Sequence, residues 1–273
     1  MSLRRQFLPL LGLAVVLLYV LAAILAPYLA PYPPDEVNLP MRLRPIGTPG
    51  HPLGTDHLGA DLLSRVLFGA RVSILVGVLA VSLSLAVGAS LGAVAGYFGG
   101  WVDGVFSRFA DLLMGFPYLL FTLFAMAILG PGIANLVLAL SFKGWVEFFR
   151  LTRGEVMSEK TREYVLAARA LGRSPAAIIA GEILPNIRHS LLVLATLRMG
   201  YLIVMEATLS FLGLGVPPDV PAWGSMVAAG REYMVSAWWI AMVPGLAVVG
   251  LVLSINLFGE GLREALDPRL RSL

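Results

Sequence analysis

Four residues close together in the sequence have side chains that could bind a metal ion: His51, Asp56, His57 and Asp61. Imidazole and carboxylate groups are common metal ligands. The chain contains no cysteine, which excludes thiolate ligands and disulfides. Without a fuller set of ligands, we expect these side chains to cap helices and to hydrogen-bond within a loop. We therefore predict no metal site, and a bound metal ion is the alternative.

Arg198 and Glu206 are ionisable residues inside a long apolar stretch. Ionisable side chains are costly within a bilayer and seldom face lipid. On one helix the two would lie about 12 Å apart along the axis, too far for an ordinary direct pair. Each therefore needs a partner elsewhere. We expect a structural ion pair or hydrogen bond, and the alternatives are a place in a path through the membrane or a role in gating.

The composition indicates an integral membrane protein. Of the 273 residues, 58% are hydrophobic and 14% are charged, whereas about a quarter of the residues in soluble domains are charged. The net charge of +3 comes from basic residues beside apolar runs, which favours membrane orientation over nucleic-acid binding. Phosphate-binding, zinc-protease and nucleophile-elbow motifs are all missing. We predict no enzyme activity and no cofactor, so any ATP chemistry must come from another chain.

Uncharged runs predict six transmembrane helices. The run 112–142 would be about 45 Å long as one helix, which exceeds a hydrocarbon core of about 30 Å. The Gly-Pro-Gly sequence at 130–132 offers a turn that divides it into two spans. The remaining predicted spans cover about 7–30, 72–102, 190–212 and 237–258.

Basic residues predict the orientation of these spans. The segment from Lys143 to Arg188 and the C-terminal tail hold most of the twenty basic residues, and cytoplasmic loops are enriched in them. We therefore predict a multi-pass protein of the plasma (inner) membrane with both termini in the cytoplasm.

The predicted regions follow from these spans. They are an N-terminal helix (1–30), an external segment with an interfacial helix (31–70), a main transmembrane domain (71–263) with a cytoplasmic hairpin (150–188), and a tail (264–273). In the second outer segment, 213–236, Trp223 and Tyr233 are expected to anchor the chain at the membrane interface.

The hairpin is the least membrane-like part of the chain, and its sequence from 163 to 186 reads EYVLAARALGRSPAAIIAGEILPN. Good helix formers extend from about 154 to 171, and Gly172 suits the left-handed position that closes a helix. Ser174 is a good N-cap and Pro175 fits the first helical position, so a second helix of about ten residues should reach Leu184 and stop before Pro185.

At roughly 15 Å the second helix is too short to cross a bilayer. It is slim and apolar, so it could insert into a groove on another protein. Packing on its own membrane domain, or lying flat on lipid, is the alternative.

The hairpin resembles the cytoplasmic signature of ABC importer permeases, in which Glu-Ala-Ala is followed by Gly and then by Leu-Pro. Five positions match: Ala167, Ala168, Gly172, Leu184 and Pro185. Leu166 replaces the signature glutamate, and Glu182 stands where isoleucine is common, so the glutamate's role is not transferred. HPLGTDHLGADLLSRVLFGARVSILVG, FLGLGVPPDVPAWGSM and the terminal LDPRLR are similar to the dipeptide, oligopeptide and nickel branch, second permease type.

The resemblance implies the type I ABC importer fold and its partners. These are a second permease in a heterodimer, two cytoplasmic ATPase subunits and an external solute-binding protein. It also implies that a coupling helix in the hairpin docks in a groove of the ATPase, although the sequence does not say which face docks. The implied coupling residues are Ala167, Ala168, Gly172, Ser174, Pro175, Ala176, Ile178, Ile179, Glu182, Leu184 and Pro185.

On this resemblance we expect a permease subunit of an ATP-driven importer for di- or oligopeptides. Transport of nickel or another small solute is the alternative within the family. An autonomous channel or ion-coupled transporter is the alternative from a different class, and an intramembrane enzyme is a third. The coupling-type hairpin argues against an autonomous transporter, and the absence of an internal sequence repeat argues against the inverted-repeat type.

Overall fold

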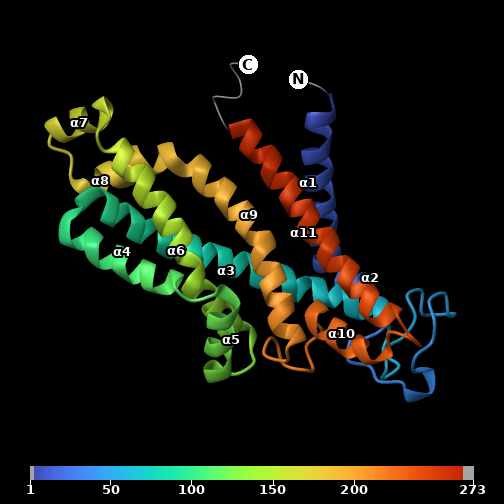
Figure 1. The fold of residues 1–273 in the computed structure, drawn as a ribbon. Helices are drawn as coiled ribbons and strands as arrows, with labels where there is room; N and C mark the ends of the chain where they lie inside the picture. Colours follow the sequence, from blue (N-terminus) through green and yellow to red (C-terminus); the bar gives the residue numbers. More distant parts are fainter. Residues whose placement is uncertain (1–2, 267–273) are drawn as a thin grey trace.

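The computed structural model describes residues 3–266, which are almost entirely helical (Figure 1). The long helices are α1 (Leu3–Ile24), α3 (Leu62–Phe98), α6 (Ile133–Glu159), α9 (Leu184–Phe211) and α11 (Trp239–Leu266). The shorter ones are α2 (Ala26–Leu29), α4 (Gly100–Met114), α5 (Tyr118–Leu129), α7 (Glu163–Ala170), α8 (Pro175–Ile178) and α10 (Trp223–Gly230). Within this range no residue forms a named β-strand, which agrees with the predicted all-α class. The predicted tail at 264–273 lies outside the described residues from 267 onward.

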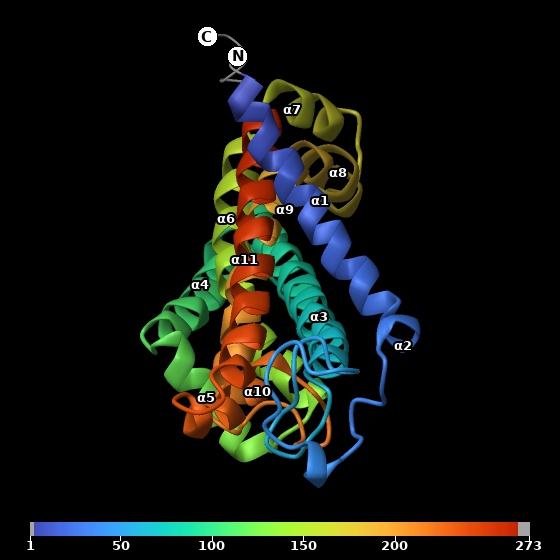
Figure 2. The same ribbon diagram turned by 90° about the vertical axis from the view of Figure 1, so that its right-hand side faces the viewer.

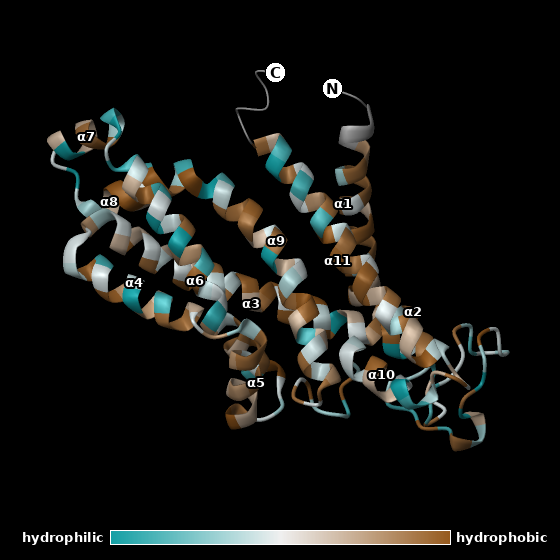
Figure 3. Ribbon diagram, viewed as in Figure 1, coloured by the Kyte–Doolittle hydropathy of each residue, from teal (hydrophilic) through white to brown (hydrophobic). Residues whose placement is uncertain are grey.

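The six-span prediction is matched approximately. Four stretches are long and apolar enough to cross a membrane, namely Phe7–Ile24, Leu62–Phe98, Pro175–Phe211 and Trp239–Leu266. The pair α4 and α5, bent by 92°, makes a fifth if it is one broken span. Helix α6 would be the sixth by length, but hydrophilic residues interrupt it (Figure 3).

The predicted turn at 130–132 is present between α5 and α6, but the span before it differs from the prediction. It begins at Gly100 instead of 112 and is interrupted at residues 115–117. The break follows from Pro117, which disfavours a helical backbone at the residue before it. Lys143 was expected at the start of the cytoplasmic segment, yet α6 continues unbroken through it to Glu159.

Helices α3 and α6 pack closely along a row of glycines. Gly88, Gly92 and Gly96 recur every four residues on α3 and face the backbone of α6. A Cβ atom on Gly92 would lie 2.6 Å from the Phe149 carbonyl oxygen, and one on Gly96 would lie 2.8 Å from the Arg153 carbonyl oxygen. Small residues at this spacing let two membrane helices approach backbone to backbone. Together α3 and α6 provide the frame on which the remaining elements are placed.

The two ends of the molecule carry different elements. The ends of α1 and α11 nearest the chain termini lie at the same end as α7 and α8, whereas α5, α10 and the segment 31–61 lie at the opposite end (Figures 1 and 2). Helix α1 packs along α11. We call the end with α7 and α8 the hairpin end and the other the loop end.

Two expectations for the loop end need correction. The predicted interfacial helix is not a separate element, because its residues from Leu62 onward are the first turns of α3. Trp223 is not an interface anchor: its side chain is fully buried, and its Nε1 donates a hydrogen bond to the Val66 carbonyl oxygen at 2.9 Å. Its ring packs on Gly69, which leaves no room for a Cβ. Burial between α3 and α10 therefore replaces the interfacial position expected from residue type.

Candidate functional site

The hairpin joins α6 to α9 through a series of short helices. The helix expected over 154–171 is interrupted at Lys160–Arg162, so that α7 is a separate element. Gly172 has a φ of +77°, the left-handed conformation expected for it. The Ser174 hydroxyl accepts a hydrogen bond from the Ala177 N–H at 3.3 Å, and Pro175 opens α8. The predicted N-cap and first position of the second helix are therefore correct.

The second helix does not stop before Pro185. A π-helical turn at Ile179–Ile183 follows α8 and leads directly into α9, which contains Pro185 in its first turn. A proline within an α-helix removes a hydrogen bond and its ring clashes with the carbonyl four residues earlier. The π turn just before Pro185 has hydrogen bonds between residues five apart in place of four. Such a turn is a known cause of bends in helices. The hairpin is thus continuous with the membrane helix α9.

Burial separates the predicted coupling residues into two groups. The side chains of Ala168 and Ile178 are buried within the chain, where they join Val165 and Ile183 in the main apolar core. For this side of the second helix, the alternative of packing on its own membrane domain therefore holds. Ile179, Glu182 and Leu184 are half-buried, and the exposed members are Ala167, Gly172, Ser174, Pro175, Ala176 and Pro185.

The most exposed apolar side chain of the hairpin was missed by sequence reasoning. Leu171 is 83% exposed, and Leu166, five residues earlier, is 48% exposed. A leucine this exposed at the end of a helix has no role in the core of its own chain. The signal was available, because Leu171 stands directly before the turn-forming Gly172, where a side chain projects away from both helices.

Polar contacts fasten the hairpin to the membrane helices. Lys160 donates to the Gly96 carbonyl oxygen at the end of α3 (2.7 Å), and Arg169 approaches the Tyr97 hydroxyl (3.4 Å). Glu182 forms an ion pair with Arg173 that closes the turn around Gly172, which accounts for the glutamate at this position. Tyr164 donates to Glu159 at 2.6 Å, and burial together with this hydrogen bond raises the pKa of Tyr164. A displacement of the hairpin would therefore be transmitted to α3 and α6.

A second candidate site lies between α6 and α9, where Glu147 forms an ion pair with Arg198. The Arg198 guanidinium lies 5.3 Å from the centre of the Tyr201 ring, which in turn meets the Tyr118 ring edge-on at 5.3 Å. The Tyr118 hydroxyl donates to the Leu140 carbonyl oxygen at 2.6 Å. These side chains surround a cavity of about 10 Å³ that Ser84 also lines. Arg198 thus has the partner that the sequence required for it.

Glu206 lies apart from this cluster. Its carboxyl group is fully buried and accepts hydrogen bonds from the hydroxyls of Ser73 on α3 and Ser210 on α9, both at 2.8 Å. These are the partners expected for it, and they join α9 to α3. The two ionisable residues singled out in the sequence therefore belong to different environments.

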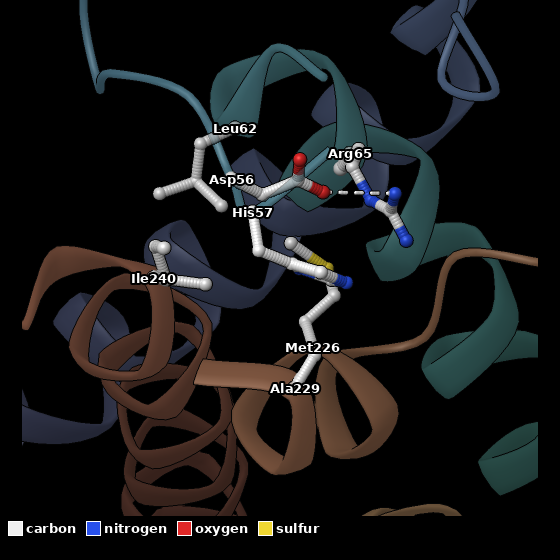
Figure 4. Close-up of a pocket in the computed structure, with 7 residues that line it drawn as sticks. All are labelled: Asp56, His57, Leu62, Arg65, Met226, Ala229 and Ile240. Carbon is white, nitrogen blue, oxygen red and sulfur yellow. Dashed lines mark hydrogen bonds and ion pairs between the residues drawn. The ribbon is translucent and has the colours of Figure 1, made fainter. Parts of the chain in front are cut away.

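The four potential metal ligands serve the loop end instead. Asp61 caps α3 by accepting from the Ser64 N–H at 2.8 Å, and its other oxygen meets His51 Nδ1 at 2.9 Å. Asp56 accepts from two backbone N–H groups and pairs with Arg65 at 3.0 Å beside His57, in a small pocket closed by α10 and α11 (Figure 4). The expected helix cap and loop hydrogen bonds are therefore present in the structure. In residues 3–266 no group of three or more His, Cys, Asp or Glu side chains is arranged to hold a metal ion.

Comparison with known proteins identifies the family. Residues 88–272 match the model described as the binding-protein-dependent transport system inner membrane component. The chain belongs to this permease family. Residues 1–45 also match the N-terminal transmembrane domain of oligopeptide transport permease C. The type I ABC importer fold and a transport role in place of an enzyme are thereby confirmed, as is membership of the peptide branch.

Similar permeases cover almost the whole chain. The di/tripeptide transport system permease of Pseudomonas aeruginosa is 42% identical over 96% of this chain and 88% of its own length. The dipeptide transport system permease of Haemophilus influenzae is 41% identical over 96% of this chain and 90% of its own. A glutathione transport system permease of Escherichia coli is 42% identical over 81% and 73%, respectively. Family membership and the apolar helices place this permease in the inner membrane as a multi-pass subunit of a larger transport system.

Three polar residues of the permease's interior were missed in the sequence: Tyr118, Lys143 and Glu147. Lys143 and Glu147 lie at the edge of a charged segment, so they read as the start of a cytoplasmic loop. Their spacing of four residues was the available signal, because it places two ionisable side chains on one face of the same helix. Tyr118 gave no comparable signal.

Proposed function

We propose that this permease forms the translocation path of an ATP-driven importer of short peptides. It would do so with a second permease, two cytoplasmic ATPases and an external solute-binding protein. The relatives at about 40% identity, named for di- and tripeptide, dipeptide and glutathione transport, support a peptide substrate. The observation that carries the proposal is the similarity to a di/tripeptide permease over 96% of this chain. Similarity of that extent includes the hairpin as well as the membrane helices.

The hairpin is the site at which the ATPase docks. Its exposed side, formed by Leu166, Ala167, Leu171, Pro175 and Ala176, is available for a partner, while Ile178 and Ile183 hold its other side on the membrane helices. An apolar helical segment fits into a groove on another protein. Movements of the ATPases would reach the membrane through α9, which continues directly from the hairpin, and through α6, which three residues, Lys160–Arg162, separate from α7.

Both termini and the hairpin lie in the cytoplasm in this proposal. Cytoplasmic reagents should therefore label a cysteine placed at Ser158 or Ser174, and external reagents one placed at Asp35 or Asp219, all of which are exposed. The basic residues of the hairpin support this orientation. Labelling of position 158 from outside intact cells would contradict it.

Uptake measurements test the transport function. The complete transporter, assembled from this permease and its partner subunits, should import a radiolabelled dipeptide such as dialanine in proteoliposomes that contain ATP. Nickel should neither be imported nor compete with the dipeptide. Uptake of Ni²⁺ without uptake of any peptide would replace the peptide proposal with the nickel alternative. Transport by the purified permease alone would contradict the ATP-driven class.

A further inference from the structure

The ion pair between Glu147 and Arg198 lies beside an unsatisfied hydroxyl group. Ser84 is fully buried, lines the same cavity, and has no hydrogen-bond partner within the described chain. Buried polar groups are nearly always paired, so an orphaned hydroxyl at a cavity marks a position for a further hydrogen-bonding group. The cavity offers only about 10 Å³, roughly enough for one water molecule.

A partly buried ion pair between two membrane helices carries a cost in free energy. Both charged groups lose hydration, a free-energy penalty that an apolar contact between the same helices would not carry. Loss of one partner would also leave the other charge unpaired. Glu206 shows that this permease joins α9 to α3 with neutral serine donors instead. The Glu147 and Arg198 side chains are also one-third exposed within the chain, at 36% and 33%, so they face a space as well as each other.

We propose that Glu147 and Arg198 bind the two charged ends of a peptide during its passage, an assignment that rests on the proposed peptide transport. Arg198 receives the C-terminal carboxylate in the forked geometry that guanidinium favours. Glu147 receives the N-terminal ammonium. A zwitterion replaces both partners of the ion pair at once, so neither side chain is left unpaired.

The neighbouring side chains fit this role. Stacking on Tyr201 fixes the Arg198 guanidinium, and Tyr118 holds Tyr201 in place. Ser84 supplies a hydroxyl for the peptide backbone. A dipeptide is up to about 7 Å long when extended, so it does not fit the cavity in this conformation. The ion pair therefore closes the site at rest, and the site forms when α6 and α9 move apart.

The inference predicts a preference for peptides with two free ends. Equilibrium binding of labelled dialanine is measured on the complete transporter in nanodiscs, without binding protein, with and without a non-hydrolysable ATP analogue. N-acetyl-dialanine lacks the ammonium group and dialanine amide lacks the carboxylate, so each should compete about tenfold less well than dialanine in at least one nucleotide state. The Glu147→Gln transporter should bind dialanine about tenfold less tightly and lose its discrimination against the acetylated peptide. The Arg198→Gln transporter should lose its discrimination against the amide.

The matched control is Arg150→Gln, which breaks an exposed ion pair with Asp111 one turn from Glu147. It should leave binding and discrimination unchanged. Equal competition by dialanine, its acetylated form and its amide in the wild type would overturn the inference. An equal loss of affinity for all three peptides in both variants would also overturn it, and the ion pair would then only hold the two helices together. Normal dialanine uptake with no detectable binding in either nucleotide state would also overturn it. Absence of peptide uptake by the wild type would instead show that the proposed function is wrong.

Discussion

The Lys143 Nζ atom lies 2.7 Å from the carbonyl oxygen of Leu113, and it also donates to the carbonyl oxygen of Phe116. The Leu113 carbonyl belongs to the last turn of α4, where it also accepts a long hydrogen bond from the Phe116 N–H (3.4 Å), and the Phe116 carbonyl lies in the break between α4 and α5. One cation thus caps a broken helix from the facing helix α6. Without such partners, an interruption at this depth would leave backbone groups unsatisfied in an apolar environment.

Lys143→Met should therefore destabilise the permease, because it keeps the length of the side chain and removes all three donors. The Phe116 carbonyl would lose its Lys143 partner, at a cost of about 1 to 3 kcal/mol, and the Leu113 carbonyl would keep only the 3.4 Å hydrogen bond from the Phe116 N–H. We expect a lower melting temperature of the assembled transporter and reduced uptake. Lys143→Arg, which retains donors, should lose less. A Lys143→Met transporter as stable as the wild type would show that the break is satisfied in another way.

A second prediction concerns the close approach of α3 and α6. The Cβ added in Gly92→Ala would meet the Phe149 backbone oxygen at 2.6 Å, and a backbone atom cannot rotate away. We expect a cost of about 1 to 3 kcal/mol, as for other overpacked sites, measured as a lower melting temperature in detergent. Gly104→Ala on α4 is the matched control, because no atom lies within 4 Å of its Cβ. Equal stability of the two variants would mean that the helix pair adjusts without strain.

The contacts of Lys143 and of Gly92 join segments far apart in the sequence, and such contacts could not be predicted from the sequence. The conformation of Gly172 and the cap by Ser174 depend on local chemistry, so they are as expected. The partner of Lys143 lies thirty residues earlier in the chain, and no local pattern couples them. The π turn before Pro185 was missed for the same reason, since the packing of Ile178 and Ile183 against the membrane helices decides whether the chain turns or continues.

Glu206 yields a third prediction from its two serine partners. Glu206→Gln keeps the shape and an oxygen that can accept from Ser73 or Ser210, whereas Glu206→Leu strands both hydroxyls. The leucine variant should lose about 1 to 3 kcal/mol per stranded group, with less assembled transporter and less uptake than the glutamine variant. Full assembly and uptake by Glu206→Leu would show that this link between α3 and α9 is dispensable.

The last prediction uses the two sides of the hairpin to test whether it docks on the ATPase. Leu171 is 83% exposed, so Leu171→Glu should leave folding intact while placing a charge where an apolar groove would receive it. Normal membrane levels with at least tenfold less co-purified ATPase and uptake are expected, if loss of an apolar anchor costs about 1.4 kcal/mol or more. Ser158→Glu, an exposed change in the last turn of α6 and outside the proposed docking side, is the control and should have no effect. Ile178→Glu should act differently, because this side chain is fully buried in its own chain, so the protein should fail to accumulate. Wild-type ATPase binding by Leu171→Glu would exclude this residue from the interface and move the docking surface to the other exposed residues around Pro175.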